Sequence, residues 1–183
     1  SRMPGGLLIT AFASCAGFAA VTGSSTATVA SIGSMSYPEL KKHGYFPGLS
    51  LAALSAGGTL GILIPPSLGM VFYAIVTEQS IGKLFIAGIL PGILLASLFC
   101  LASLSIALIK PELAPRGSDA TWKERFRVLP KMSVIPVIFV IIIGGIYTGI
   151  YTPTEAAGCA TAFVLLAMVV AGRFSWKGVL ASL

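Results

Sequence analysis

The sequence has little charge and few side chains that carry out chemistry. Of its 183 residues only 10% are charged, with 12 basic and 6 acidic side chains and a single histidine, whereas a soluble domain has about 25% charged residues. Its three cysteines lie far apart in apolar runs, so they predict neither a disulfide framework nor a metal-ligand cluster. These deficits argue against a water-soluble enzyme, a disordered chain and a nucleic-acid-binding domain.

Apolar residues dominate the chain instead. They make up 56% of it, and the mean hydropathy is +0.95, which predicts an all-α membrane protein in a lipid bilayer. The net charge of +6 then bears on topology and not on a polyanionic partner. The N-terminus has no initiator methionine and no signal-peptide pattern, so we expect the chain to begin inside a longer protein.

Charged residues divide the sequence into five uncharged stretches. The third and fourth, Leu84–Ile109 and Met132–Thr154, have 26 and 23 residues, enough for one helix each across a hydrocarbon core of about 30 Å. The fifth, Ala156–Gly172, has 17 residues and is just long enough. We therefore expect one spanning helix at 84–109, two at 132–172, and the start of a further, truncated segment at 173–183.

The first two uncharged stretches do not fit one crossing each. Met3–Pro38 and Gly44–Thr77 have 36 and 34 residues, which as straight helices would measure about 54 and 51 Å. Such lengths are too long for one crossing and too short for two crossings with a turn. Each stretch must be broken inside the membrane, at Thr22–Thr26 in the first and at Ile64–Ser67, which contains Pro-Pro, in the second.

The basic residues indicate the orientation. If Leu84–Ile109 spans, 11 of the 12 basic residues collect on one side and only Lys83 lies opposite, so the crowded side is cytoplasmic. Residues 1–36 must then enter and leave on that side as a re-entrant helical hairpin, while residues 44–77 form a Pro-Pro-broken helix. Re-entrant backbone needs protein or a water-filled cavity around it, and 20 of the 27 residues from Thr10 to Ser36 are Ala, Gly, Ser or Thr, a composition that favours close helix packing.

The loop at residues 110–131 joins the third and fourth stretches. Trp122, Phe126 and Leu129 recur at helical spacing with basic residues between them. This pattern predicts a cytoplasmic loop with a short interfacial helix that ends near Pro130 and anchors the chain to the membrane surface.

The two breaks form the candidate binding site. Pro65 and Pro66 lack a backbone donor, so the carbonyls of Gly61 and Ile62 lose their helical partners. The Thr22–Thr26 tip offers hydroxyls, carbonyls and the N-terminus of the following helix. A kink or a capped turn would explain either break alone, but paired broken helices can hold a cation at their carbonyl ends and an anionic substrate at their amide ends.

Other polar residues favour structural roles. Thr152 and Glu155 have capping-box spacing, with Pro153 at the first helical position, so we expect a structural cap and not a proton-carrying glutamate. His43 falls in a cytoplasmic loop, where a solvated or tyrosine-adjacent role is expected in place of catalysis. A hydroxyl nucleophile in Met3–Pro38 would have no His, Lys, Asp or Glu in its own stretch to act as a base, so no enzyme is predicted.

The sequence resembles the large membrane subunit, a dicarboxylate-type permease, of the tripartite ATP-independent periplasmic (TRAP) transporters. The resemblance is carried by three segments, Phe18–Thr28, Gly57–Ser67 and Gly145–Ala157, and the similarity runs along nearly the whole chain. The resemblance implies a multi-pass secondary transporter of the bacterial inner (cytoplasmic) membrane that imports organic anions, dicarboxylates or sugar acids, by symport with sodium. It also implies two partners, a periplasmic substrate-binding protein and a small TRAP membrane subunit.

The resemblance further implies that residues 1–36 and 44–77 belong to the moving transport domain of an elevator-type ion transporter, as its first inverted repeat. Members of the family pair this half with an inverted second repeat that has its own Pro-Pro break, and no second Pro-Pro occurs here. We therefore expect that the chain is a fragment, or that a partner supplies the rest, and that a complete substrate pocket does not form from this segment alone.

In a protein of this family the two breaks would help to form a sodium site beside the substrate. Sodium is favoured because the breaks carry neutral oxygens and no carboxylate, whereas a proton-coupled organic-anion carrier would place an Asp or Glu there. The alternatives are such a proton-coupled carrier, a non-transporting membrane scaffold subunit and a channel. No cofactor other than the coupling sodium ion is expected. The candidate sodium- and substrate-binding residues are Gly23, Ser24, Ser25, Thr26, Gly58, Thr59, Gly61, Ile62, Pro65, Pro66 and Ser67.

Overall fold

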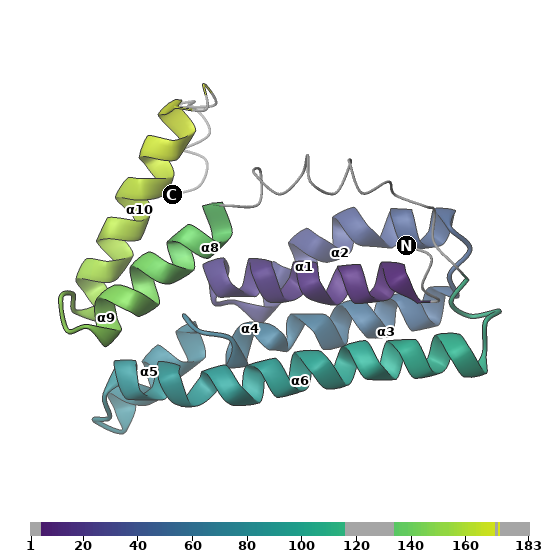
Figure 1. Ribbon diagram of the computed structural model, residues 1–183, viewed down its shortest axis with the longest axis horizontal. Helices are drawn as coiled ribbons and strands as arrows, with labels where there is room; N and C mark the ends of the chain where they lie inside the picture. Colours follow the sequence, from purple (N-terminus) through teal and green to yellow (C-terminus); the bar gives the residue numbers. More distant parts are fainter. Residues whose placement is uncertain (1–4, 116–133, 171, 173–183) are drawn as a thin grey trace.

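The chain is built from helices that pack side by side, with no strand among the residues described (Figure 1). This computed structural model describes residues 5–115, 134–170 and 172. In chain order the elements are α1 (Gly6–Thr22), α2 (Ser25–Lys42), α3 (Pro47–Gly58), α4 (Leu60–Leu63), α5 (Leu68–Val76), α6 (Ile81–Ile109), α8 (Val134–Phe139), the π-helical turn η1 (Val140–Gly144), α9 (Gly145–Tyr147) and α10 (Pro153–Val170). The predicted all-α fold class is confirmed for these residues.

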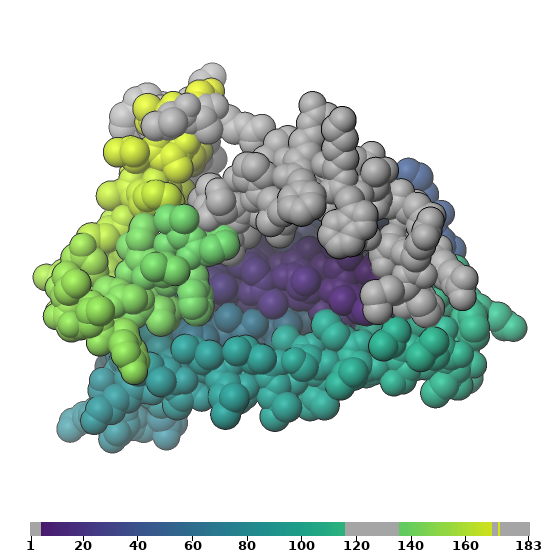
Figure 2. Space-filling view, viewed as in Figure 1, coloured from purple at the N-terminus to yellow at the C-terminus, as the bar shows by residue number. Residues whose placement is uncertain are grey.

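The longest helix, α6, covers the whole stretch in which a spanning helix was expected. It has 29 residues, or about 43 Å at 1.5 Å per residue, and Ser80 caps its start by accepting a hydrogen bond from the Lys83 N–H at 3.5 Å. Large apolar side chains such as Leu90 and Leu94 stand on its exposed face, and α6 forms one long edge of the molecule in Figure 2. Among the described residues it is the one helix that is long and apolar enough to cross a membrane by itself.

The second predicted break is also a break in the structure. The helical segments Pro47–Leu63 and Leu68–Val76 meet at an angle of 42°, and only together are they long and apolar enough to form a second span. Gly57 and Gly58 lie at the end of α3, close against the first hairpin. The broken helix therefore runs alongside α6 but changes direction part of the way.

Four helix ends meet at one end of the molecule. The Phe46 N–H, before α3, donates to the Leu113 carbonyl, after α6, at 3.0 Å. Gly5, at the start of α1, lies against Ser103 and Ala107 near the end of α6. Because α2 ends at Lys42, four residues before Phe46, the α1–α2 hairpin begins and ends at this same end. The α1–α2 hairpin thus has both of its ends on one side of the helical body, and its re-entrant placement in a membrane stays a prediction.

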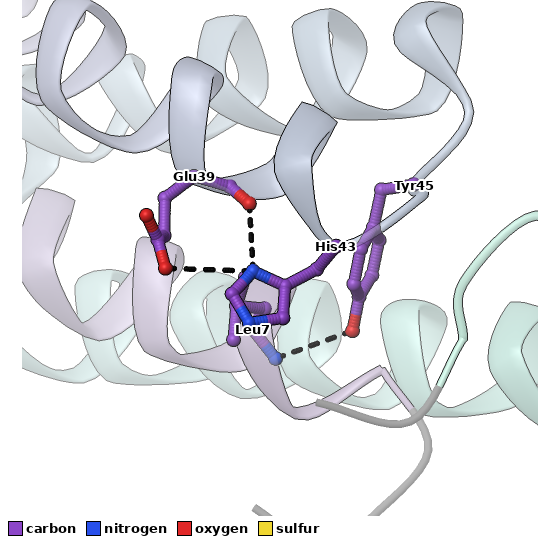
Figure 3. A network of polar contacts seen from close by, with 4 residues as sticks. All are labelled: Leu7, Glu39, His43 and Tyr45. Carbon is purple, nitrogen blue, oxygen red and sulfur yellow. Dashed lines mark hydrogen bonds and ion pairs between the residues drawn. The ribbon is translucent and has the colours of Figure 1, made fainter. Parts of the chain in front are cut away.

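The core of the helical body lies near that end. Its buried residues are Leu8, Ala11, Phe12, Leu40, Tyr45, Ala53, Leu54, Ala107 and Ala114. Tyr45 is 2% exposed, and its hydroxyl accepts a hydrogen bond from the Leu7 N–H at 3.4 Å (Figure 3). His43 lies beside it, with Nδ1 2.9 Å from the carbonyl oxygen and 3.4 Å from Oε1 of Glu39. These contacts fix the base of the hairpin.

The hairpin is shorter than the helix beside it. Its arms have 17 and 18 residues, or about 26 Å each, against about 43 Å for α6. The tip therefore ends within the length of α6 and not at either end. At this level the Leu63 carbonyl, at the end of α4, lies against Gly88 and Gly92 of α6, where the absence of a Cβ permits the approach.

The C-terminal helices form a second, smaller cluster around Ile138, Ile142, Ala156 and Ala160. The first of them is interrupted by the π-helical turn η1, which the sequence analysis did not predict. Residues 116–133 and 173–183 lie outside the described residues, as do the predicted interfacial helix and the predicted start of a further segment. In the structure, residues 134–172 contain two apolar helical segments that are both shorter than α6.

The last helix begins with a capping box. The Thr152 N–H donates to Oε2 of Glu155 at 2.7 Å, and the Glu155 N–H donates to Oγ1 of Thr152 at 3.3 Å. Pro153 is the first residue of α10, where its missing N–H costs nothing. Hydrogen bonds from the Thr152 backbone and hydroxyl hold the pKa of the exposed Glu155 carboxyl below its usual range.

This cap predicts a small acid sensitivity. Because the folded-state pKa of Glu155 is lowered, the cap contributes stability above the ordinary pKa of glutamate and loses it as the pH falls through the lowered pKa. We expect Glu155→Gln, which keeps an acceptor oxygen, to remove part of the fall in Tm between neutral and acidic pH. Thermal unfolding of the full-length protein in detergent measures this. The exposed Glu112, outside α10, is the control: an equal effect of Glu112→Gln would contradict the assignment.

Candidate functional site

The first break is made by one glycine and one capping serine. Gly23 adopts the left-handed conformation with φ 60°, and its N–H closes α1 by donating to Ala19 at 2.8 Å. Ser24 is extended, and its side chain caps α2 by accepting from the Ala27 N–H at 3.4 Å. Glycine and serine are the residue types these two positions need, which is why the helix stops here.

The second break follows from the two prolines. The Ile64 N–H still donates to Leu60 at 2.8 Å, but Pro65 and Pro66 have no N–H to donate. Among the described residues, no hydrogen bond reaches the carbonyl oxygens of Gly61 or Ile62, as expected from the sequence. A new helix, α5, starts after Ser67, whose side chain does not cap it.

The two breaks cross in direct backbone contact. The Leu68 N–H donates to the Gly23 carbonyl at 3.2 Å, which joins the start of α5 to the end of α1. A Cβ on Gly23 would lie 2.5 Å from the Pro66 carbonyl oxygen, and one on Gly61 would lie 2.9 Å from the Ser25 nitrogen. Only glycine fits at these two crossing points, so the sequence positions that break the helices also let them meet.

Among the residues that the structure describes, two serine hydroxyls at this crossing have no hydrogen-bond partner. Oγ of Ser25 and Oγ of Ser67 are both buried, and Ser67 as a whole is 1% exposed. Leaving a buried hydroxyl unsatisfied costs about 1–3 kcal/mol. The crossing thus contains two buried hydroxyl oxygens that are unsatisfied among the described residues, and neutral oxygens at broken membrane helices are suited to hold a hard cation.

The ligand chemistry at the crossing is restricted. No carboxylate belongs to either break, and no group of three or more His, Cys, Asp or Glu that could hold a metal ion occurs in residues 5–115, 134–170 and 172. Neutral oxygen atoms from hydroxyls and carbonyls suit an alkali cation better than a transition metal, which favours imidazole or thiolate ligands.

A cavity of about 960 Å³ opens beside the crossing. Thr22 and Ser67 line it on the side of the two breaks, and apolar residues such as Ile142 and Val164 line it on the side of η1 and α10. Thr161 adds one hydroxyl to that side. The cavity is therefore mainly apolar, with hydroxyls at the broken helices and one on α10, and its volume suits a small organic molecule.

The structure brings most of the candidate residues together, but not all of them. Gly23, Ser24, Ser25, Gly58, Gly61, Pro66 and Ser67 meet at the crossing. The exposed Thr59 hydroxyl donates to Ala56 of the preceding helix at 2.7 Å, and Thr26 contacts Ser24 through their hydroxyls at 3.2 Å. The Ile62 side chain is 54% exposed, so only its carbonyl is relevant. Pro65 lines a second, apolar cavity of about 750 Å³ against α1 and α6.

Sequence reasoning did not identify the cavity wall on α10. Thr161 stands in an apolar run in which nothing marks it as functional, and its place beside the breaks depends on how the C-terminal helices fold back. Thr28 was also overlooked, because the hairpin has a hydroxyl in nearly every turn and spacing alone does not separate them.

Comparison with known proteins places this geometry in context. The family model described as "Tripartite ATP-independent periplasmic transporter, DctM component" matches residues 1–183. The chain is 44% identical over 171 residues to the ectoine TRAP transporter large permease protein TeaC of Halomonas elongata, covering 92% of this chain and 39% of the relative.

Two further relatives have other substrates in their names. The chain is 46% identical over 166 residues to the C4-dicarboxylate TRAP transporter large permease protein DctM of Pseudomonas aeruginosa, covering 88% of this chain and 38% of the relative. It is 31% identical over 161 residues to the sialic acid TRAP transporter permease protein SiaT of Haemophilus influenzae, covering 87% of this chain and 25% of the relative. The chain thus spans well under half of the length of these relatives.

The crossing predicts that Gly23 and Gly61 do not tolerate a side chain. Gly23→Ala combines a positive φ with a contact to the Pro66 carbonyl, and Gly61→Ala pushes against the backbone at Ser25. We expect each to lower the free energy of unfolding by about 1–3 kcal/mol, because backbone atoms must move. Thermal or denaturant unfolding of the full-length protein in detergent measures the effect.

The matched controls lie in the two arms of the same hairpin. Gly17 and Gly33 have nothing within 4 Å of the position of a Cβ. Gly17→Ala and Gly33→Ala should be neutral or stabilising, by up to about 1 kcal/mol, since alanine favours helix more than glycine does. Equal losses at all four glycines would mean that the crossing has no special role.

Proposed function

The chain belongs to the DctM component family of the tripartite ATP-independent periplasmic transporters, and from that premise we propose that it forms part of the permease of a sodium-coupled importer of organic anions. The three relatives described above are named as transporter permease proteins, and none of these names gives a catalytic activity. The proposed location is the bacterial inner membrane. The observation that carries the proposal is the pair of unpartnered serine hydroxyls where the two broken helices cross.

Sodium is held in this proposal by neutral oxygens at the crossing. The candidate ligands are Oγ of Ser25, Oγ of Ser67 and the carbonyl oxygens of Gly61 and Ile62, all of which lack a partner among the described residues. A bound cation would satisfy these oxygens and offset the cost of burying them. Coupling to protons is disfavoured because no side chain in either break titrates near neutral pH.

An organic anion binds next to the ion in this scheme. Two helices, α2 and α5, begin at the crossing, and their N-termini carry partial positive charge toward the cavity of about 960 Å³. Sodium adds a full positive charge at the same place. Dicarboxylates or sugar acids would be attracted there, although the relatives' names range from C4-dicarboxylate to ectoine and sialic acid.

The remaining parts of the machinery lie outside this chain. We place a periplasmic substrate-binding protein upstream as the donor of the anion, and a small membrane subunit beside the permease. The backbone contacts at Gly23 and Gly61 join the hairpin and the broken helix, which supports their moving together as one transport domain. Residues beyond this chain would complete the substrate pocket.

The decisive experiment measures uptake under imposed gradients. The full-length permease, its small subunit and its binding protein are reconstituted in proteoliposomes, with a radiolabelled ligand identified by a thermal-shift screen of the binding protein. We expect uptake with an inward sodium gradient and none with a proton gradient alone. Uptake driven equally well by protons in the absence of sodium would reject the proposed coupling.

Serine substitutions locate the ion. Ser25→Ala and Ser67→Ala each remove one candidate ligand, and we expect the sodium concentration for half-maximal uptake to rise about tenfold. Ser34→Ala is the control, because Ser34 is exposed and bonds only the Ser31 carbonyl of its own helix among the described residues. Unchanged uptake in Ser67→Ala and Ser25→Ala would instead favour a scaffold without a transport role.

A further inference from the structure

One buried threonine ties the two arms of the hairpin together. Thr28, in the first turns of α2, is 0% exposed. Its Oγ1 donates to the Ser24 carbonyl at 2.7 Å, and its N–H donates to the same carbonyl at 3.0 Å. The same Oγ1 lies 3.4 Å from Oγ1 of Thr22, the last residue of α1. Thr28 therefore contacts both sides of the first break.

This arrangement differs from an ordinary helical threonine. Thr10, in α1, also donates its hydroxyl to the carbonyl four residues earlier, Gly6, at 2.8 Å. Thr10 is exposed, and its hydroxyl reaches no other element among the described residues. A threonine that only satisfied its own helix would not need the burial of Thr28 or its contact with the opposite arm.

The hydroxyl protons are shared across the break. Oγ1 of Thr22 lies 3.1 Å from the Phe18 carbonyl and 3.4 Å from Oγ1 of Thr28, while Thr28 itself is closest to Ser24. Two protons thus serve three hydrogen bonds, and the short bond from Thr28 to Ser24 takes one of them. The Thr22 proton is then shared between the Phe18 carbonyl and Oγ1 of Thr28, and the contact between the two hydroxyls joins the end of α1 to the start of α2.

The carbonyl that Thr28 holds lies at the crossing itself. The Ser24 oxygen is 3.1 Å, and the Ser25 nitrogen 2.9 Å, from where a Cβ on Gly61 would stand. Fixing the Ser24–Ser25 peptide therefore fixes how Ser25 faces the second break. A rotation of this peptide would turn the Ser25 hydroxyl relative to Ser67.

We infer that Thr28 is a positioning residue for the coupling ion: it holds the Ser24–Ser25 peptide so that Ser25 and Ser67 present their hydroxyls to one cation. The inference rests on the proposed sodium site and adds a residue that is not itself a ligand. Removing the Thr28 hydroxyl should weaken sodium binding while leaving every candidate ligand in place.

The test uses sodium alone as the probe. The full-length permease is purified in detergent, and its thermal stability is titrated with NaCl against KCl at constant ionic strength. We expect Thr28→Val to raise the half-maximal sodium concentration about fivefold, because it loses one buried hydrogen bond. Thr28→Ser, which keeps the hydroxyl, should have a half-maximal sodium concentration within about twofold of the wild type. Thr10→Val, which removes the same type of bond far from the tip, should leave it unchanged.

A second variant covers the case in which Thr28→Val does not fold. Thr22→Val removes the other hydroxyl of the pair from a half-buried position, and a smaller rise, about twofold to threefold, is expected. A wild type that does not respond to sodium overturns the coupling proposal and this inference with it. If the wild type responds to sodium and Thr28→Val or Thr22→Val has the same half-maximal sodium concentration, only the role of Thr28 is overturned. The same holds if Thr10→Val raises the half-maximal sodium concentration as much as Thr28→Val does.

Discussion

The structure depends on one constraint: peptide groups freed from a helix inside an apolar body must find new partners. Gly23 ends one helix and Pro65 with Pro66 ends another, and each break alone would leave buried amides and carbonyls unpaired. The two breaks pair some of these groups with each other, because the Leu68 N–H donates a hydrogen bond to the Gly23 carbonyl. The groups that remain unpaired among the described residues, two serine hydroxyls and two carbonyls, supply the ligands of the proposed ion site. The site thus consists of the polar groups that the fold does not pair.

The breaks themselves could be predicted from length and composition. Uncharged stretches of 36 and 34 residues fit no whole number of membrane crossings, and the Gly-Ser-Ser and Pro-Pro sequences indicate where each helix is interrupted. The basic residues predict which side of a membrane the hairpin enters from, and that prediction stays open because it concerns the bilayer and not the contacts between helices. These features depend on local chemistry and on the thickness of the bilayer, which are both readable along the chain.

The finer features depend on packing and could not be predicted. Thr59 and Ser67 look equally suitable as ligands in the sequence. The Thr59 hydroxyl donates to Ala56 of the preceding helix, whereas the Ser67 hydroxyl is buried and has no partner among the described residues. Thr28 has the same side chain as Thr26, two residues earlier, but only Thr28 turns into the hairpin. The π-helical turn at Val140–Gly144 has no marker in its run of branched residues. Each difference is set by which neighbour covers a side chain, and a single sequence does not contain that information.

The hairpin is attached at its base and carries its functional groups at its far end. With arms of 17 and 18 residues, or about 26 Å, a tilt of about 5° at the base would displace the tip by about 2 Å. Oxygen ligands must be placed roughly ten times more accurately than that, to about 0.2 Å. The aromatic and histidine contacts at the base therefore do not suffice to aim the ligands. Lateral fit along the arms adds to the constraint, as where Cys15 fills the space over Gly57, so the position of the tip depends on contacts along the whole length of the hairpin.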